Sequence, residues 1–94
     1  MKFFSKKSLG QNFLIDQKVI DIITETGNIT SDDEILEVGP GKGALTQSIL
    51  IKKPKAFTVI EKDKYLADIL KEKYDGKINV INEDILKTYE SSIS

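Results

Sequence analysis

A glycine-rich segment is the part of the sequence with the clearest chemical potential. Gly39, Gly41 and Gly43 alternate with Pro40 and Lys42, between a short apolar run and a stretch with helical spacing. Where such a turn joins a strand to a helix, a ligand can touch the backbone and the helix N-terminus offers free N–H groups to an anion. Glycines alone are weak evidence, because turns collect glycine. The segment predicts a ligand site only if its neighbours agree.

Two acidic residues, Glu61 and Asp84, follow the next two apolar runs. Glu61 lies 22 positions after Gly39, near the spacing of about 20 at which an acid binds ribose hydroxyls in nucleotide-binding folds. A carboxylate at Asp84 can accept a hydrogen bond from an adenine amine. Each acid alone could be a turn residue or a helix cap, but together they indicate a nucleoside site. With Ala44 the glycines also fit the dinucleotide pattern, so an NAD site stays open.

Composition excludes several kinds of chemistry. The 94 residues contain no cysteine and no histidine, which excludes thiolate and imidazole metal sites, cysteine nucleophiles and histidine acid–base catalysis. The 14 cationic residues are all lysine, and 15 acids leave a net charge of −1, so no overall basic field indicates a nucleic-acid partner. No apolar run reaches the length of about 18–20 residues that a membrane span needs. We expect a cytoplasmic protein without a metal or a membrane partner.

The elements that position these residues alternate in type. Residues 1–15 are basic and predict an extended arm, and a first helix should end at Gly27. Apolar spacing and β-branched runs predict helices and strands in turn: helix 16–26, strand 35–38, helix 44–52, strand 56–60, helix 63–74 and strand 78–81. Short connections imply parallel strands joined by right-handed crossovers, in the order 3-2-1 of a Rossmann-like α/β fold.

The predicted sheet is half of a complete one. Because a doubly wound sheet has about six strands, we interpret residues 16–94 as an incomplete Rossmann-like cofactor-binding domain, truncated after its third strand. The first and third strands would then each lack a neighbour from their own chain. Unpaired edges invite pairing with another molecule, so we expect self-association through exposed strand edges.

Four blocks of the sequence match one family pattern: residues 7–16 (KSLGQNFLID), 37–46 (EVGPGKGALT), 59–63 (VIEKD) and 82–84 (NED). Together they resemble the ribosomal RNA adenine N6,N6-dimethyltransferase family of the KsgA type. The LGQNFL block is the specific part, because other adenosylmethionine enzymes share the glycine loop without it. The related macrolide-resistance methyltransferases also carry Gln-Asn-Phe, but their loop tends to have serine where Pro40 stands here.

The resemblance implies a site for S-adenosyl-L-methionine. Its implied cofactor-binding residues are Asn12, Leu14, Gly39, Gly41, Glu61 and Asp84. Asn12 and Leu14 would contact the cofactor from the arm, and Gly39 and its loop would take the methionine part. Glu61 would bind the ribose diol and Asp84 the adenine amine. We interpret Phe13 as a core anchor of the arm.

For a full-length protein, the resemblance implies methyl transfer to two adjacent adenines near the 3′ end of small-subunit 16S rRNA, with the 30S subunit as partner. The family's Asn-Leu-Pro-Tyr segment, which activates the adenine amine, is absent from these residues. We therefore expect no catalytic residue here and no activity from the chain alone. The alternatives are a macrolide-resistance-type 23S rRNA methyltransferase, an NAD-binding half-domain of an oxidoreductase, and a ribosome-binding assembly module without catalysis.

Overall fold

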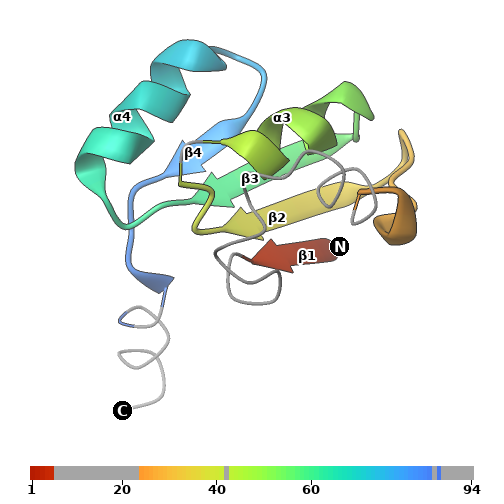
Figure 1. The fold of residues 1–94 in the computed structure, drawn as a ribbon, viewed down its shortest axis with the longest axis horizontal. Coiled ribbons are helices and arrows are strands. Elements are labelled where there is room, and N and C mark those ends of the chain that lie inside the picture. Colours follow the sequence, from red (N-terminus) through yellow and green to blue (C-terminus); the bar gives the residue numbers. More distant parts are fainter. Residues whose placement is uncertain (6–23, 42, 86, 88–94) are drawn as a thin grey trace.

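A parallel sheet of four strands, in the order β1-β2-β3-β4, forms the centre of the computed structural model (Figure 1). The structure describes residues 1–5, 24–41, 43–85 and 87. The strands and helices are β1 (Lys2–Ser5), β2 (Glu34–Val38), α3 (Ala44–Ile51), β3 (Ala56–Ile60), α4 (Lys64–Lys73) and β4 (Asn79–Ile81). Residues 24–27 are also helical.

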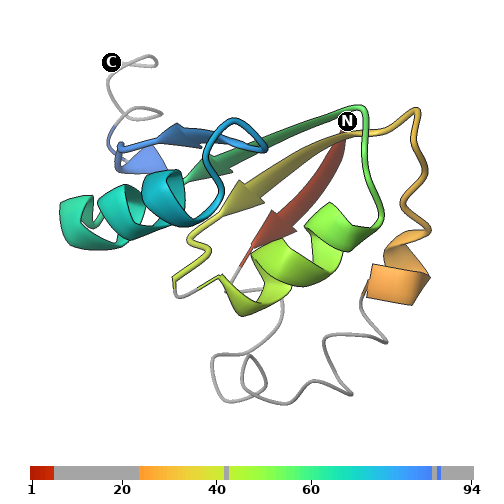
Figure 2. The same cartoon turned by 90° about the horizontal axis from the view of Figure 1, so that it is seen from above.

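The strand order confirms the expected half of a doubly wound sheet. The three predicted strands are β2, β3 and β4, which lie side by side and parallel with β3 in the middle. Helix α3 connects β2 to β3, and α4 connects β3 to β4. Both crossovers move in the same direction across the sheet, so both helices cover the same face (Figures 1 and 2). The carboxyl ends of these strands consequently meet at one edge.

Alternating strand side chains form the core beneath these helices. In β2 every second residue is buried, as expected for a strand with one face against a helical layer, and β3 follows the same pattern until Ile60, which is buried as well. The buried core residues are Phe4, Ile29, Ile35, Leu45, Ile49, Phe57, Val59, Leu70 and Tyr74. The core thus packs the helices against the sheet and fixes the positions of the strand ends.

Helix α4 starts and faces the core largely as its sequence predicts. Asp63 caps it, because Asp63 Oδ1 accepts the Leu66 N–H at 3.0 Å. The apolar Ile69 is 40% exposed, whereas Ala67 is fully buried. Ala67 lies three residues before Leu70, so the two share the face of the helix that meets the sheet.

Strand β1 is an element that the sequence pattern did not predict. Residues 1–15 were expected to form an extended arm, and β2 was expected to lack one neighbour. Instead, Lys2–Ser5 pairs in parallel with β2 along its length. Phe4 explains the docking, because this residue is only 8% exposed and belongs to the core. Among the described residues the open edges are therefore β1 and β4; the rest of the expected arm lies outside them.

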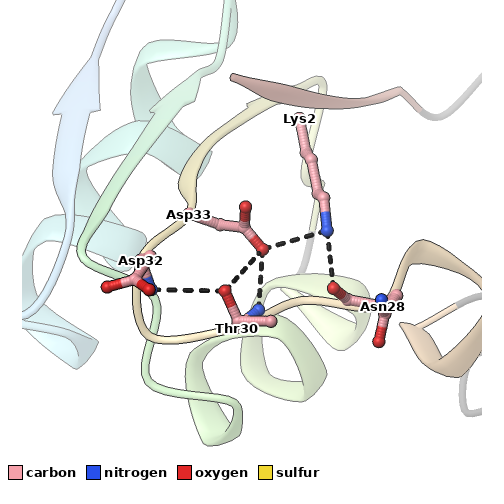
Figure 3. A network of polar contacts seen from close by, with 5 residues as sticks. All are labelled: Lys2, Asn28, Thr30, Asp32 and Asp33. Atoms are coloured by element: carbon pink, nitrogen blue, oxygen red, sulfur yellow. Dashed lines mark hydrogen bonds and ion pairs between the residues drawn. The ribbon is translucent and has the colours of Figure 1, made fainter.

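A polar network ties β1 to the segment that leads into β2 (Figure 3). Lys2 Nζ lies 2.9 Å from Asp33 Oδ2 and donates to the carbonyl oxygen of Asn28. The Thr30 N–H donates to the same Asp33 oxygen at 2.7 Å. The hydrogen bond from Thr30, and then that from Lys2, hold the pKa of Asp33 below its usual value. The network therefore depends on an ionised Asp33.

The first helix does not end at the residue that the sequence predicts. Only residues 24–27 of this region are described, and the expected helix 16–26 lies mostly outside them. Gly27 was expected to stop the helix, yet it is itself helical and Asn28 carries the positive φ of 50°. A Cβ at Gly27 would lie 2.9 Å from Phe4 Cζ. The absence of a side chain at Gly27 therefore allows the Phe4 ring to pack closely against the backbone.

Candidate cofactor-binding site

The glycine loop leaves β2 and begins α3, as predicted. Gly39 and Gly41 have φ values of 70° and 60°, and Gly43, the N-cap of α3, has φ 89°. Residues with a side chain rarely adopt these values, so this path requires glycine. The Gly39 N–H donates to the Ile60 carbonyl oxygen at 2.9 Å. This bond fixes the loop beside the carboxyl end of β3.

Glu61 follows β3 and lies against the glycine loop. Its side chain is buried, with 5% of the residue exposed. Glu61 Oε1 accepts the Gly41 N–H at 3.1 Å, and Oε2 accepts the Asp63 N–H at 3.0 Å. A carboxylate has about four lone-pair positions, so two can still accept hydrogen bonds from a ligand. Glu61 thus joins the loop to the start of α4 and retains the capacity expected for a ribose diol.

Asp84 lies beyond the carboxyl end of β4, at the same edge of the sheet. The Glu61 N–H donates to the Ile81 carbonyl oxygen at 2.9 Å, which aligns the ends of β3 and β4. Asn82 Nδ2 donates to the Glu61 carbonyl oxygen at 2.9 Å and holds the following turn in place. Asp84 Oδ1 accepts the Lys87 N–H at 3.4 Å, the pattern of a helix cap. Glu61 and Asp84 therefore follow two adjacent strands. Asp84 also accepts a backbone hydrogen bond from the segment after it.

Glu37 is a residue of this site whose role the sequence pattern did not reveal. It lies on β2, two positions before Gly39, and is only 2% exposed. Thr46 Oγ1 of α3 donates to Glu37 Oε1 at 2.6 Å. Burial, and to a lesser extent the charge of Glu61, raise the pKa of Glu37 to about 7, against the effect of the Thr46 hydrogen bond. The available signal was an acid at a strand position where alternation predicts a core side chain.

The acidic edge, as we call Glu37 and Glu61 together, determines which ligands suit the loop. Both carboxyl groups are buried, and the charge of Glu61 adds a smaller contribution to the effect of burial on the pKa of Glu37. A phosphate anion close to the charge of Glu61 would be repelled in this poorly solvated environment. A cation, or a group of hydroxyl donors, would be stabilised. This edge therefore suits a cationic nucleoside better than a pyrophosphate.

Two of the six expected cofactor residues, Asn12 and Leu14, lie outside the described residues, as does Phe13. The other four are Gly39, Gly41, Glu61 and Asp84, and the fold brings them to one edge of the sheet. Within the described ranges, no three histidine, cysteine or acidic residues are grouped so that they could hold a metal ion. No helix among the described residues has the length and apolarity needed to cross a membrane.

Comparisons with known proteins add independent evidence. The family model described as ribosomal RNA adenine dimethylase matches residues 2–92. A protein named ribosomal RNA small subunit methyltransferase A, from Pelagibacter ubique, is 58% identical over 90 residues, which cover 96% of this chain and 34% of the relative. The protein of the same name from Malacoplasma penetrans is 44% identical over 86 residues, or 92% of this chain and 31% of the relative.

A solved structure agrees with this result. The crystal structure of the 23S rRNA methyltransferase ErmE matches with a TM-score of 0.70 and 42% identity, over 80% of this chain and 31% of that chain. The match confirms the Rossmann-like methyltransferase fold. The chain spans about a third of the length of the curated relatives described above. The family match extends over nearly all of it, and the chain belongs to the ribosomal RNA adenine dimethylase family.

Proposed function

We propose that this chain is the cofactor-binding part of an enzyme that methylates the N6 amines of two adjacent adenines near the 3′ end of small-subunit 16S rRNA. The family match over residues 2–92 supports the rRNA substrate, and the observation that carries the cofactor assignment is the acidic edge beside the glycine loop. S-adenosyl-L-methionine bears a sulfonium and an ammonium group, both cations that this edge attracts. The pyrophosphate of NAD would instead face two buried carboxyl groups.

The described residues fit this cofactor in their donors and acceptors. Glu61 retains two acceptor positions for the ribose hydroxyls, and Asp84 offers a carboxylate to the adenine amine. The backbone at Gly39 and Gly41 would take the methionine part, with Asn12 and Leu14 as further contacts. When bound, the cofactor supplies an electrophilic methyl group. The residues of this chain orient it, because an in-line displacement depends on alignment.

A large-subunit rRNA target is the second candidate, and the likeness to ErmE favours it. Two observations favour the small subunit. The Pelagibacter relative named for the small subunit is 58% identical, against 42% for ErmE. The loop has Pro40, where the loop of the macrolide-resistance enzymes tends to have serine. We therefore assign the 30S subunit as the partner and the cytoplasm as the compartment of the reaction.

Titration calorimetry with S-adenosylhomocysteine and with NADH tests the cofactor assignment. We expect the chain to bind S-adenosylhomocysteine more tightly, because NADH brings two phosphates to the acidic edge. Tighter binding of NADH would refute the proposal. A second assay incubates the chain with labelled S-adenosyl-L-methionine and unmethylated 30S subunits. We expect no label in the RNA, because these 94 residues contain no Asn-Leu-Pro-Tyr segment to accept the protons of the adenine amine.

A further inference from the structure

We propose that a groove at the amino-terminal edge of the sheet binds the phosphodiester backbone of folded rRNA. The groove has a volume of about 620 Å³ and lies between the carboxyl-terminal half of α3 and the last residue of α4, above the start of β3. Four exposed lysines line it, and we call it the lysine groove: Lys53, Lys55, Lys73 and Lys77. The identification of the polyanion as rRNA rests on the proposed function.

The charge of the groove departs from that of the whole chain. The net charge is −1, yet no acidic side chain lines the lysine groove. Within the described residues, none of its four lysines forms an ion pair, whereas three lysines elsewhere do. Exposed ammonium groups without carboxylate partners can exchange their counterions for phosphates, which is the main source of affinity for nucleic acid.

Helix capping explains only one of the four cations. Lysines in the last turn of a helix stabilise its dipole, and Lys73 occupies that position in α4. Lys77 lies four residues past the helix, and Lys53 and Lys55 lie in the loop after α3. The groove therefore collects lysines from two loops that are distant in sequence and that the two crossovers bring together.

The loop between α3 and β3 presents its lysines from a fixed backbone. The Lys53 N–H donates to the Leu50 carbonyl oxygen at 3.0 Å, and the Lys55 N–H donates to the Asp33 carbonyl oxygen at 2.8 Å. Pro54 stands between the two lysines and restricts the backbone further. Across the groove, Lys73 Nζ lies 5.3 Å from the centroid of the Tyr74 ring. Backbone order of this kind lowers the entropic cost of binding.

The position of the groove suits a folded RNA that also reaches the cofactor edge. The five residues of β3 separate the amino and carboxyl edges by about 17 Å, at roughly 3.3 Å per residue. RNA is a polyanion whose helices extend well beyond this distance. A folded rRNA can therefore place phosphates on the lysine groove while another part of it lies at the opposite edge.

Fluorescence anisotropy with a labelled RNA hairpin tests the proposal. One variant replaces the groove lysines with glutamine: Lys53→Gln, Lys55→Gln, Lys73→Gln and Lys77→Gln. The matched control makes the same charge change at exposed lysines elsewhere: Lys62→Gln, Lys64→Gln, Lys71→Gln and Lys87→Gln. We expect the groove variant to lose about tenfold or more in affinity, and its slope of log K against log salt to become shallower by about 2–4. Equal losses in both variants would overturn the proposal.

Two further measurements distinguish loss of RNA contacts from misfolding of the variant, and failure of the groove assignment from failure of the proposed function. Acetylation footprinting of the unchanged chain should show RNA protecting the groove lysines more than the control lysines; the reverse order contradicts the proposal. The groove variant should also bind S-adenosylhomocysteine as the unchanged chain does. If neither protein binds that ligand while RNA still protects the groove, the proposed function fails and the groove assignment stands.

Discussion

The two ends of one sheet carry opposite chemistry. At the carboxyl end, the acidic edge is buried and its two carboxyl groups interact with each other. At the amino end, the lysine groove has four exposed lysines and no acidic side chain in its lining. Buried charges act strongly on one small ligand, because little solvent screens them. Exposed charges act weakly one by one and depend on salt, which suits a long polyanion.

The largest expected effect concerns Glu37 at the acidic edge. Its pKa is raised from 4.5 to about 7 in the folded chain, so the folded state holds a proton that the unfolded state releases at lower pH. The contribution of Glu37 to the free energy of unfolding should therefore be fully present below pH 4.5, decrease by about 3 kcal/mol as the pH rises to 7, and be absent above that. Urea denaturation at a series of pH values measures this. Glu37→Gln, which still accepts from Thr46, should remove the decrease, and an unchanged decrease would contradict the assignment.

The second effect concerns cofactor affinity. Glu61→Ala should weaken binding of S-adenosylhomocysteine by about 1–3 kcal/mol, the range for lost charged hydrogen bonds. Its bonds to the Gly41 and Asp63 N–H groups mean that ligand-free stability should also decrease. Calorimetry on the folded protein separates the two losses. The control Glu72→Ala changes an exposed acid on α4 and should alter neither quantity. Unchanged affinity in Glu61→Ala would make Glu61 a purely structural residue.

The third effect concerns Tyr74, whose side chain extends from the lysine groove towards the glycine loop at the opposite end of the sheet. Tyr74 lines the lysine groove, and its hydroxyl lies 3.6 Å from the place of a Cβ at Gly43. Among the described residues this buried hydroxyl has no hydrogen-bond partner. Tyr74→Phe should therefore raise the free energy of unfolding by about 1 kcal/mol. Thermal denaturation measures it, and a clear loss of stability would mean that the hydroxyl is satisfied in solution.

The smallest effect lies beside β1, at the amino end. The pKa of Asp33 is lowered by Thr30 and by Lys2, so its contribution to stability is present at neutral pH and is lost as the pH falls through that lowered pKa. The sign is opposite to that of Glu37. Asp33→Asn should lower the free energy of unfolding at neutral pH and flatten the acid limb of the stability profile, because the variant has no such contribution to lose as the pH falls. A variant with an unchanged acid limb would show that the network is not formed.

Local patterns predicted much of this fold and part of the site. Alternation and helical spacing placed β2, β3, β4 and both helices, and parallel topology brought Glu61 and Asp84 to one edge. Strand β1 could not be predicted, because four residues carry little pattern and Phe4 docks through contacts distant in sequence. The burial that raises the pKa of Glu37 is likewise a tertiary effect. The lysine groove arises only once the crossovers bring two loops together.

The cofactor and the RNA are expected to bind at opposite ends of the sheet. Amide chemical-shift mapping by ¹⁵N NMR tests it most directly, with S-adenosylhomocysteine and an RNA hairpin titrated separately into the same chain. We expect the nucleoside to shift the amides of Gly39, Gly41, Glu61 and Asp84, and the RNA to shift those around the lysine groove. If the nucleoside shifts only the groove amides, or if both ligands shift the same amides, the separation of the two ends is contradicted.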